Sequence, residues 1–113
     1  MKLFSFLIVS LLFTAYSCSQ NTGYDQKESF KVYGNCGMCQ NTIESSLADV
    51  DGIHSANWDV DSKQITVKFN SEDISLEEIK KRIAKVGYDS DDFRAKDATY
   101  KSLPSCCQYE RPE

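Results

Sequence analysis

The sequence has no excess of positive charge. It holds 13 Lys and Arg residues against 17 Asp and Glu residues, which gives a formal net charge of -4. Because nucleic acids are bound mainly through basic groups on phosphate, this deficit disfavours a nucleic-acid partner. At 113 residues the chain has room for one domain and little more. A small domain seldom encloses a deep substrate cavity, so the length also disfavours an enzyme.

Long apolar runs are missing as well, with one partial exception at residues 3–13. This run is broken only by Ser5 and Ser10, but a membrane span needs about 20 apolar residues. Lys2 precedes the run and small residues follow it, which is the layout of a secretory signal over residues 1–17. Its removal would take away Lys2 and leave 12 basic against 17 acidic side chains, a net charge of -5.

Cys18 follows this run and resembles the lipidated cysteine of bacterial lipoprotein signals, although Ala15 stands where such signals usually have Leu. Lipidation would give a use to the odd one of five cysteines. Ordinary cleavage after the small residues Ala15 and Ser17 is the alternative. We expect an exported protein of the bacterial periplasm or cell envelope, held on the membrane as a lipoprotein through Cys18.

The rest of the pattern predicts an α+β domain over residues 28–95, between a polar tether (18–27) and a C-terminal tail (96–113). Alternating apolar residues predict strands, and apolar residues at helical spacing predict two helices, the second of which opens with a Ser75–Glu78 capping box. The predicted order is strand 28–34, helix 38–50, strand 53–60, strand 64–70, helix 76–86 and a weak strand within 91–95. This β-α-β-β-α-β order predicts a ferredoxin-like sandwich of two helices on a four-stranded antiparallel sheet.

In this topology the stretch "YGNCGMCQNT" (33–42) connects the first strand to the first helix, and we call residues 34–38 the cysteine loop. The chain direction predicts that this loop shares one end of the domain with the turn at residues 61–63 and with Gly87-Tyr88. Exposed N–H groups and the dipole at a helix start favour a thiolate. Gly34 and Gly37 would let Cys36 and Cys39 converge on one soft metal ion. A structural disulfide or a pair of buried thiols is the alternative.

The stretch "YGNCGMCQNTIESSL", with "GYD" after the second helix, resembles the heavy-metal-associated domain of copper metallochaperones, copper-pumping ATPases and the periplasmic mercury-binding protein. The resemblance covers about residues 28–95 and implies that Cys36 and Cys39 bind the metal. It implies Cu(I) as the ion, with Zn(II) or Hg(II) as alternatives, for capture, transport or detoxification. It further implies a metal-transporting ATPase or an efflux component as partner.

The sequence departs from this family next to the first cysteine. Gly34 and Asn35 stand where the family has Met and Thr. In the family that Met packs under the metal loop, a role that could pass here to Met38 or Tyr33. Tyr88 matches an aromatic position that leans over the metal loop in bacterial relatives.

The remaining candidate residues lie outside the Cys36–Cys39 stretch. His54, the only histidine, would begin the second strand, away from the cysteine loop, so we expect a core or surface residue rather than a ligand. The alternation with Ala56 and Val60 places Trp58 in the core. Cys106 and Cys107 lie beyond the family domain. They could join the first pair as extra ligands, form an independent metal or redox pair, or form a vicinal disulfide without function.

A thiol-disulfide redox protein is the alternative function for the Cys36–Cys39 pair. The absence of Trp before Cys36 and of Pro inside "CGMC" argues against it.

Overall fold

The computed structural model describes residues 23–113. The predicted signal (1–17) and Cys18 lie outside this range. Over residues 23–113 no helix combines the length and the apolar character that crossing a membrane requires.

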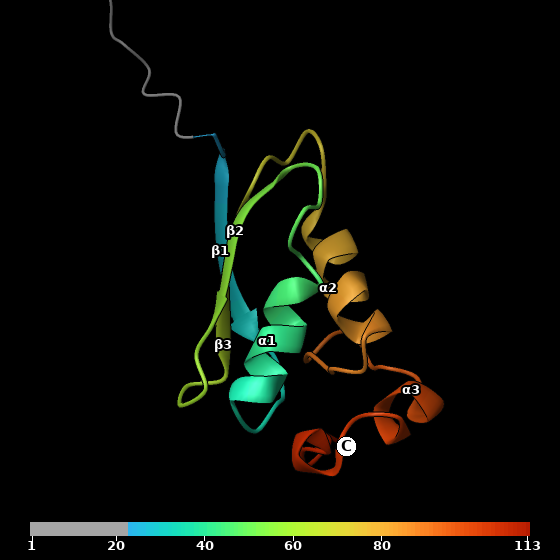
Figure 1. The fold of residues 1–113 in the computed structure, drawn as a ribbon. Helices are drawn as coiled ribbons and strands as arrows, with labels where there is room; N and C mark the ends of the chain where they lie inside the picture. Colours follow the sequence, from blue (N-terminus) through green and yellow to red (C-terminus); the bar gives the residue numbers. More distant parts are fainter. Residues whose placement is uncertain (1–22) are drawn as a thin grey trace, which may run out of the picture.

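A three-stranded antiparallel sheet forms one layer of the fold (Figure 1). Its strands are β1 (Gln26–Lys31), β2 (Ile53–Trp58) and β3 (Gln64–Phe69), in the order β1-β3-β2. The central strand β3 buries Ile65, Val67 and Phe69 on one face, as the alternation predicts. β1 starts at Gln26, two residues before the predicted start of the domain.

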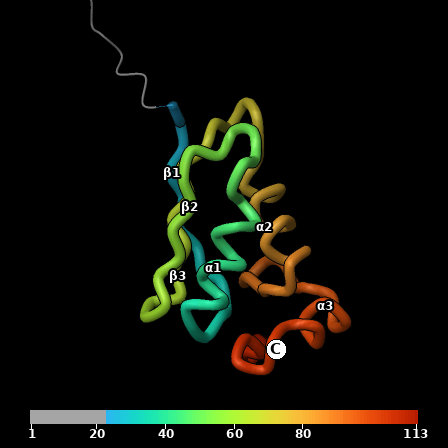
Figure 2. The backbone as a smooth tube through the Cα atoms, in the orientation of Figure 1, coloured from blue at the N-terminus to red at the C-terminus, as the bar shows by residue number. Residues whose placement is uncertain are grey.

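Two helices, α1 (Gly37–Ser45) and α2 (Leu76–Lys85), lie against one face of the sheet (Figure 2). The apolar stripe predicted for α2 consists of Leu76, Ile79, Ile83 and Val86. Ile79 and Ile83 are fully buried in the core, and Leu76 and Val86 are partly buried against it. Full burial of such a side chain contributes about 1.5–3 kcal/mol. The Ser75 hydroxyl caps this helix by accepting a hydrogen bond from the Glu78 N–H group at 3.1 Å, as predicted.

The first helix is shorter than predicted. α1 ends at Ser45, and the chain continues in turns to Asp49, which has a left-handed backbone (φ 56°). Leu47 is still buried, so the apolar spacing reflects contact with the core rather than continued helix. The prediction of helix to residue 50 is therefore wrong at its C-terminal end.

The predicted strand within 91–95 is not a strand in the described chain. Beside β1 there is a single bridge between Val32 and Ser90. Beyond it the chain turns, because the Ser90 N–H group donates to the Phe93 carbonyl at 2.9 Å and the Ala95 N–H group donates to the buried Asp89 carboxylate at 2.7 Å. These local bonds replace the ladder that a fourth strand would need. Over residues 23–113 the sheet thus has three strands and one bridge at the fourth position.

The C-terminal tail has structure that the sequence pattern does not predict. It forms a short helix, α3 (Asp97–Lys101), and a 3₁₀ turn, η1 (Ser105–Cys107). The tail lies beyond the end of the domain at which α1 begins (Figure 1). This position brings η1 to the cysteine loop.

Candidate metal centre

Three connections meet at one end of the domain, as the topology predicts. The Val32 N–H group donates to the Lys63 carbonyl at 2.9 Å, which joins the first loop to the β2–β3 turn. The Tyr33 N–H group donates to the Asp89 carbonyl at 2.9 Å, which joins the same loop to the segment after α2. The chain that leads into the cysteine loop is therefore joined by backbone hydrogen bonds to the β2–β3 turn and to the segment after α2.

Within this loop the two cysteines have different surroundings. Cys36 is the N-cap residue of α1 and is partly exposed, whereas Cys39 lies in the first turn and is fully buried. The Asn35 N–H group donates to the Cys39 sulfur at 3.3 Å. Burial raises the pKa of the Cys39 thiol, but hydrogen bonds from the Asn35 and Cys36 backbone, together with the Tyr88 and Cys107 side chains, lower it below its usual value.

The tail brings two further thiols to this loop. The sulfur atoms of Cys36, Cys106 and Cys107 all lie within 4.8 Å of one another. The Cys106 and Cys107 sulfurs are 3.9 Å apart, and the Cys106 thiol lies 3.5 Å from the Met38 thioether sulfur. The four cysteines within residues 23–113 are all free thiols. We call Cys36, Cys106 and Cys107 the thiol cluster.

Cys107 is the buried member of the thiol cluster. Burial, followed by the neighbouring Cys39 side chain, raises the pKa of its thiol to about 12. Cys106, by contrast, is exposed. The Cys106 backbone carbonyl accepts a hydrogen bond from the Asn35 side-chain amide at 3.4 Å, which connects η1 directly to the cysteine loop.

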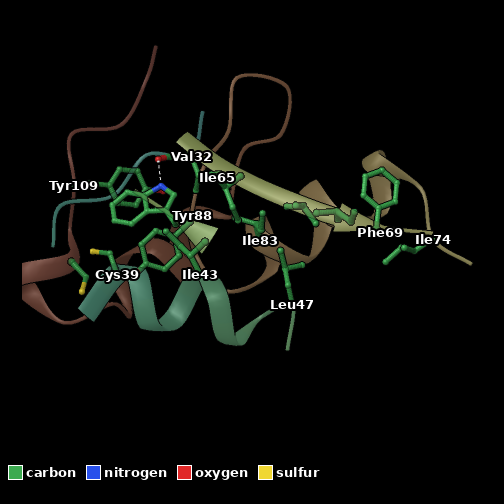
Figure 3. Packing of buried hydrophobic residues seen from close by; sticks show 14 residues of the cluster. Val32, Cys39, Ile43, Leu47, Ile65, Phe69, Ile74, Ile83, Tyr88 and Tyr109 are labelled. Carbon is green, nitrogen blue, oxygen red and sulfur yellow. Dashed lines mark hydrogen bonds between the residues drawn. The ribbon is translucent and has the colours of Figure 1, made fainter. Parts of the chain in front are cut away.

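Aromatic side chains close the inner side of the site (Figure 3). Tyr88 is fully buried and stacks on Tyr109 with ring centroids 5.6 Å apart. Figure 3 shows both rings with Cys39 at one end of the core, far from Phe69 and Ile74 at the other. Burial, followed by the sulfurs of Cys39 and Cys107, raises the pKa of Tyr88. Tyr88 therefore lies beside the cysteines, while Tyr109 of the tail adds a second ring.

Arg111 holds the tail against the domain. Its guanidinium donates to both carboxylate oxygens of Asp89, at 2.8 and 3.0 Å, and to the Ala95 carbonyl at 2.6 Å. The Arg111 side chain is 12% exposed and the Asp89 side chain 0%. The Tyr109 hydroxyl adds two bonds: it donates to the Gly87 carbonyl at 2.7 Å and accepts from the Asp89 N–H group at 2.8 Å. We call Arg111, Asp89 and Tyr109 the latch.

Sequence reasoning missed the latch. Asp89 belongs to the "GYD" step, but its partners are about 20 residues away in a segment without periodicity. Only the presence of a cation and a tyrosine directly after the vicinal cysteines could have pointed to it.

The other predicted residues lie as follows. His54 is exposed in β2, with its ring 5.2 Å from that of Tyr24, and it belongs to no described group of metal-ligating side chains. Trp58 is a core residue, as predicted, and its indole N–H group donates to the Val32 carbonyl at 3.0 Å. Met38 is half exposed on α1 and contacts the thiol cluster.

The fold and the site together define a class: small α+β domains that present a Cys-x-x-Cys pair at the start of their first helix. The family model described as heavy-metal-associated domain matches residues 31–89, just over half of the chain. The chain belongs to the heavy-metal-associated domain family.

Individual relatives agree with this assignment. The copper chaperone CopZ of Staphylococcus haemolyticus (strain JCSC1435) is 38% identical over 55 residues, which is 49% of this chain and 81% of the relative. A solved structure of a CopZ metallochaperone has 30% identity and a TM-score of 0.55, covering 57% of this chain and 98% of the other.

Two further solved structures share the fold. The N-terminal domain of a potential copper-translocating P-type ATPase from Bacillus subtilis, in the Cu(I)-loaded state, has 29% identity and a TM-score of 0.54, over 57% of this chain and 81% of the other. Oxidized MerP from Ralstonia metallidurans CH34 has 20% identity and a TM-score of 0.50, over 57% of this chain and 94% of that one. MerP therefore supports the fold alone.

Proposed function

We propose that this protein binds Cu(I) through the thiolates of Cys36 and Cys39 and carries the ion as cargo. The observation that carries the proposal is the position of this pair at the N-terminus of α1 in a domain of this family. Soft thiolates select Cu(I) and similar ions, and a helix N-terminus favours the charged form of the sulfur. The lowered pKa of Cys39 fits this role. Zn(II) and Hg(II) are the alternative ions.

Transfer would proceed by ligand exchange, in which a thiolate of an acceptor replaces one of the two loop thiolates at a time. No covalent bond of an organic substrate is made or broken, so the role is that of a carrier rather than an enzyme. The likeness to copper chaperones and to the N-terminal domain of a copper-translocating P-type ATPase supports such an ATPase, or an efflux component, as the acceptor.

The proposal extends to the place of action. Export by residues 1–17 and a lipid on Cys18 would hold the domain at the surface of a bacterial membrane, where it would meet incoming metal. Mass spectrometry of the protein purified from membranes tests this point: a diacylglyceryl adduct on Cys18 is expected, and an unmodified Cys18 would end the lipoprotein proposal.

The metal proposal is tested by competition for Cu(I) with a chelator under anaerobic, reducing conditions. The full chain carries Cys18→Ser in every variant, so that the only thiols are the four described ones. Adding Cys36→Ser and Cys39→Ser should abolish tight binding. Because Cys39 is buried and its loss could disturb the fold, Cys36→Ser alone is measured too. Unchanged affinity in these variants refutes the proposal, and disulfide reductase activity without Cu(I) affinity would favour the redox alternative.

A further inference from the structure

The thiol cluster joins parts of the chain that the family domain keeps separate. Cys36 belongs to the cysteine loop, whereas Cys106 and Cys107 lie outside the family match, which ends at residue 89. The three sulfurs nevertheless lie within 4.8 Å of one another. Three sulfurs at the usual metal–sulfur distance of about 2.3 Å around one ion are about 4 Å apart. The cluster therefore needs only a small contraction to hold an ion.

The vicinal pair already has the spacing that chelation needs. Adjacent cysteines chelate one ion awkwardly in general, but the sulfurs of Cys106 and Cys107 are 3.9 Å apart with the chain in its folded conformation. Cys39 is not among the three sulfurs that lie within 4.8 Å of one another. Its buried sulfur accepts a hydrogen bond from the Asn35 N–H group at 3.3 Å. Met38 adds a soft thioether sulfur at 3.5 Å from Cys106 on the exposed side.

The latch fixes the tail in the position that makes the cluster. Arg111 and Tyr109 lie two to five residues beyond the vicinal pair and bind the buried Asp89 carboxylate and the backbone around it. The Asn35 amide bonds the Cys106 carbonyl on the other side. Cys106 and Cys107 are thus held between two sets of contacts, so little freedom is lost when they bind an ion.

We infer that Cys36, Cys106 and Cys107 form a three-thiolate site for Cu(I), in which the tail supplies two ligands and covers the cysteine loop. The inference rests on the proposed function and refines it. With its own tail thiols in place, the domain would retain the ion until the tail moves away, and an acceptor would then meet the Cys36–Cys39 pair. Three thiolates without a fourth thiolate suit Cu(I) better than zinc, whose structural sites are tetrahedral.

The sulfur coordination number of bound Cu(I), measured by X-ray absorption, tests this inference in the full-length Cys18→Ser protein. The expected number is three, falling to two in Cys106→Ser plus Cys107→Ser. In chelator competition, the variant with Cys106→Ser plus Cys107→Ser should lose affinity by at least about 10- to 100-fold. Losing a group that only hydrogen-bonds to a metal ligand already has an effect of this size. Since Cys107 is buried and its change could unfold the tail, Cys106→Ser at an exposed position provides the second measurement.

The outcomes separate the two proposals. Two-sulfur coordination in the parent protein, or unchanged affinity in Cys106→Ser, overturns the three-thiolate site. If Cys36→Ser plus Cys39→Ser still abolishes binding in that case, the loop proposal stands. Unchanged affinity in the loop variant refutes the loop proposal itself, whatever the tail variants show.

Discussion

The packing around Gly34 accounts for the absence of the family's methionine at this position. A β-carbon at Gly34 would lie 3.0 and 3.1 Å from ring carbons of Trp58 and 3.2 Å from the β-carbon of Cys39. These distances are tighter than ordinary van der Waals contact, so an added side chain would force the indole or the cysteine to shift. Trp58 is itself fixed by its bond to the Val32 carbonyl. At this position Trp58, rather than Met38 or Tyr33, lies beneath the cysteine loop.

Gly34→Ala should therefore destabilise the protein, whereas Gly37→Ala should not. Overpacking of a well-filled site typically costs about 1–3 kcal/mol. Gly37 is the matched control, since a β-carbon there meets nothing within 4 Å. Urea unfolding followed by circular dichroism measures both. Equal midpoints for the two variants would show that Trp58 moves aside freely and that Gly34 is not required by packing.

Arg111 should matter more for stability than its place near the chain end indicates. Arg111→Gln leaves the Asp89 carboxylate buried with its main cation removed, and breaking such a buried pair costs about 3–5 kcal/mol. Asp97 also contacts Arg111, at 2.7 Å, but its side chain is 75% exposed. Asp97→Asn should cost no more than about 1 kcal/mol. Urea unfolding that gave both variants the same small loss would mean that the latch does not hold the tail.

At the scale of elements, the helix that was predicted best, α2, is also the one whose start, buried face and end are determined by nearby residues. α2 combines a capping residue, an apolar stripe and a Gly87 stop with positive φ (107°), all readable within a dozen residues. Ser75→Ala should cost about 1 kcal/mol, because the Glu78 N–H group loses its acceptor. Ser75→Asn, which keeps an acceptor, should recover most of the loss in thermal unfolding. If Asn fails to recover it, the serine acts through something other than its cap.

Element ends that have no periodic signal were predicted less well. The end of α1 depends on the left-handed turn at Asp49, which the apolar spacing through Leu47 hides. The predicted fourth strand does not form over residues 91–95, because the Asp89 side chain binds Ala95 and Arg111 and the chain turns instead of pairing further with β1. Neither cause has a periodic signal, so short-range pattern reasoning could find the elements but not these ends.

The same limit applies to the candidate site at the scale of the whole molecule. Topology alone brought the cysteine loop, the β2–β3 turn and the Gly87-Tyr88 step to one end of the domain, and backbone bonds at 2.9 Å join these segments. The position of Cys106 and Cys107 could be raised only as a question, since a tail without periodicity has no predicted path. In the structure the latch fixes this position, and its residues Asp89, Tyr109 and Arg111 are far apart in the sequence.

Metal binding should stabilise the whole chain by an amount set by the ratio of free ion to its Kd. Cu(I) that binds the folded state alone, at a free concentration 100 times its Kd, adds about 2.7 kcal/mol to the free energy of unfolding. In the Cys18→Ser background, urea unfolding under anaerobic conditions should show this rise for the parent protein and none for Cys36→Ser plus Cys39→Ser.

Cys106→Ser should show a smaller rise at the same free Cu(I) concentration, because its weaker affinity lowers the ratio of free ion to Kd. The metal-free proteins provide the baseline, and Cys106 is exposed, so its replacement should leave that baseline nearly unchanged. A full rise in Cys106→Ser would mean that the tail closes over the loop without binding the ion. A full rise in the loop variant would place the bound copper away from α1 altogether.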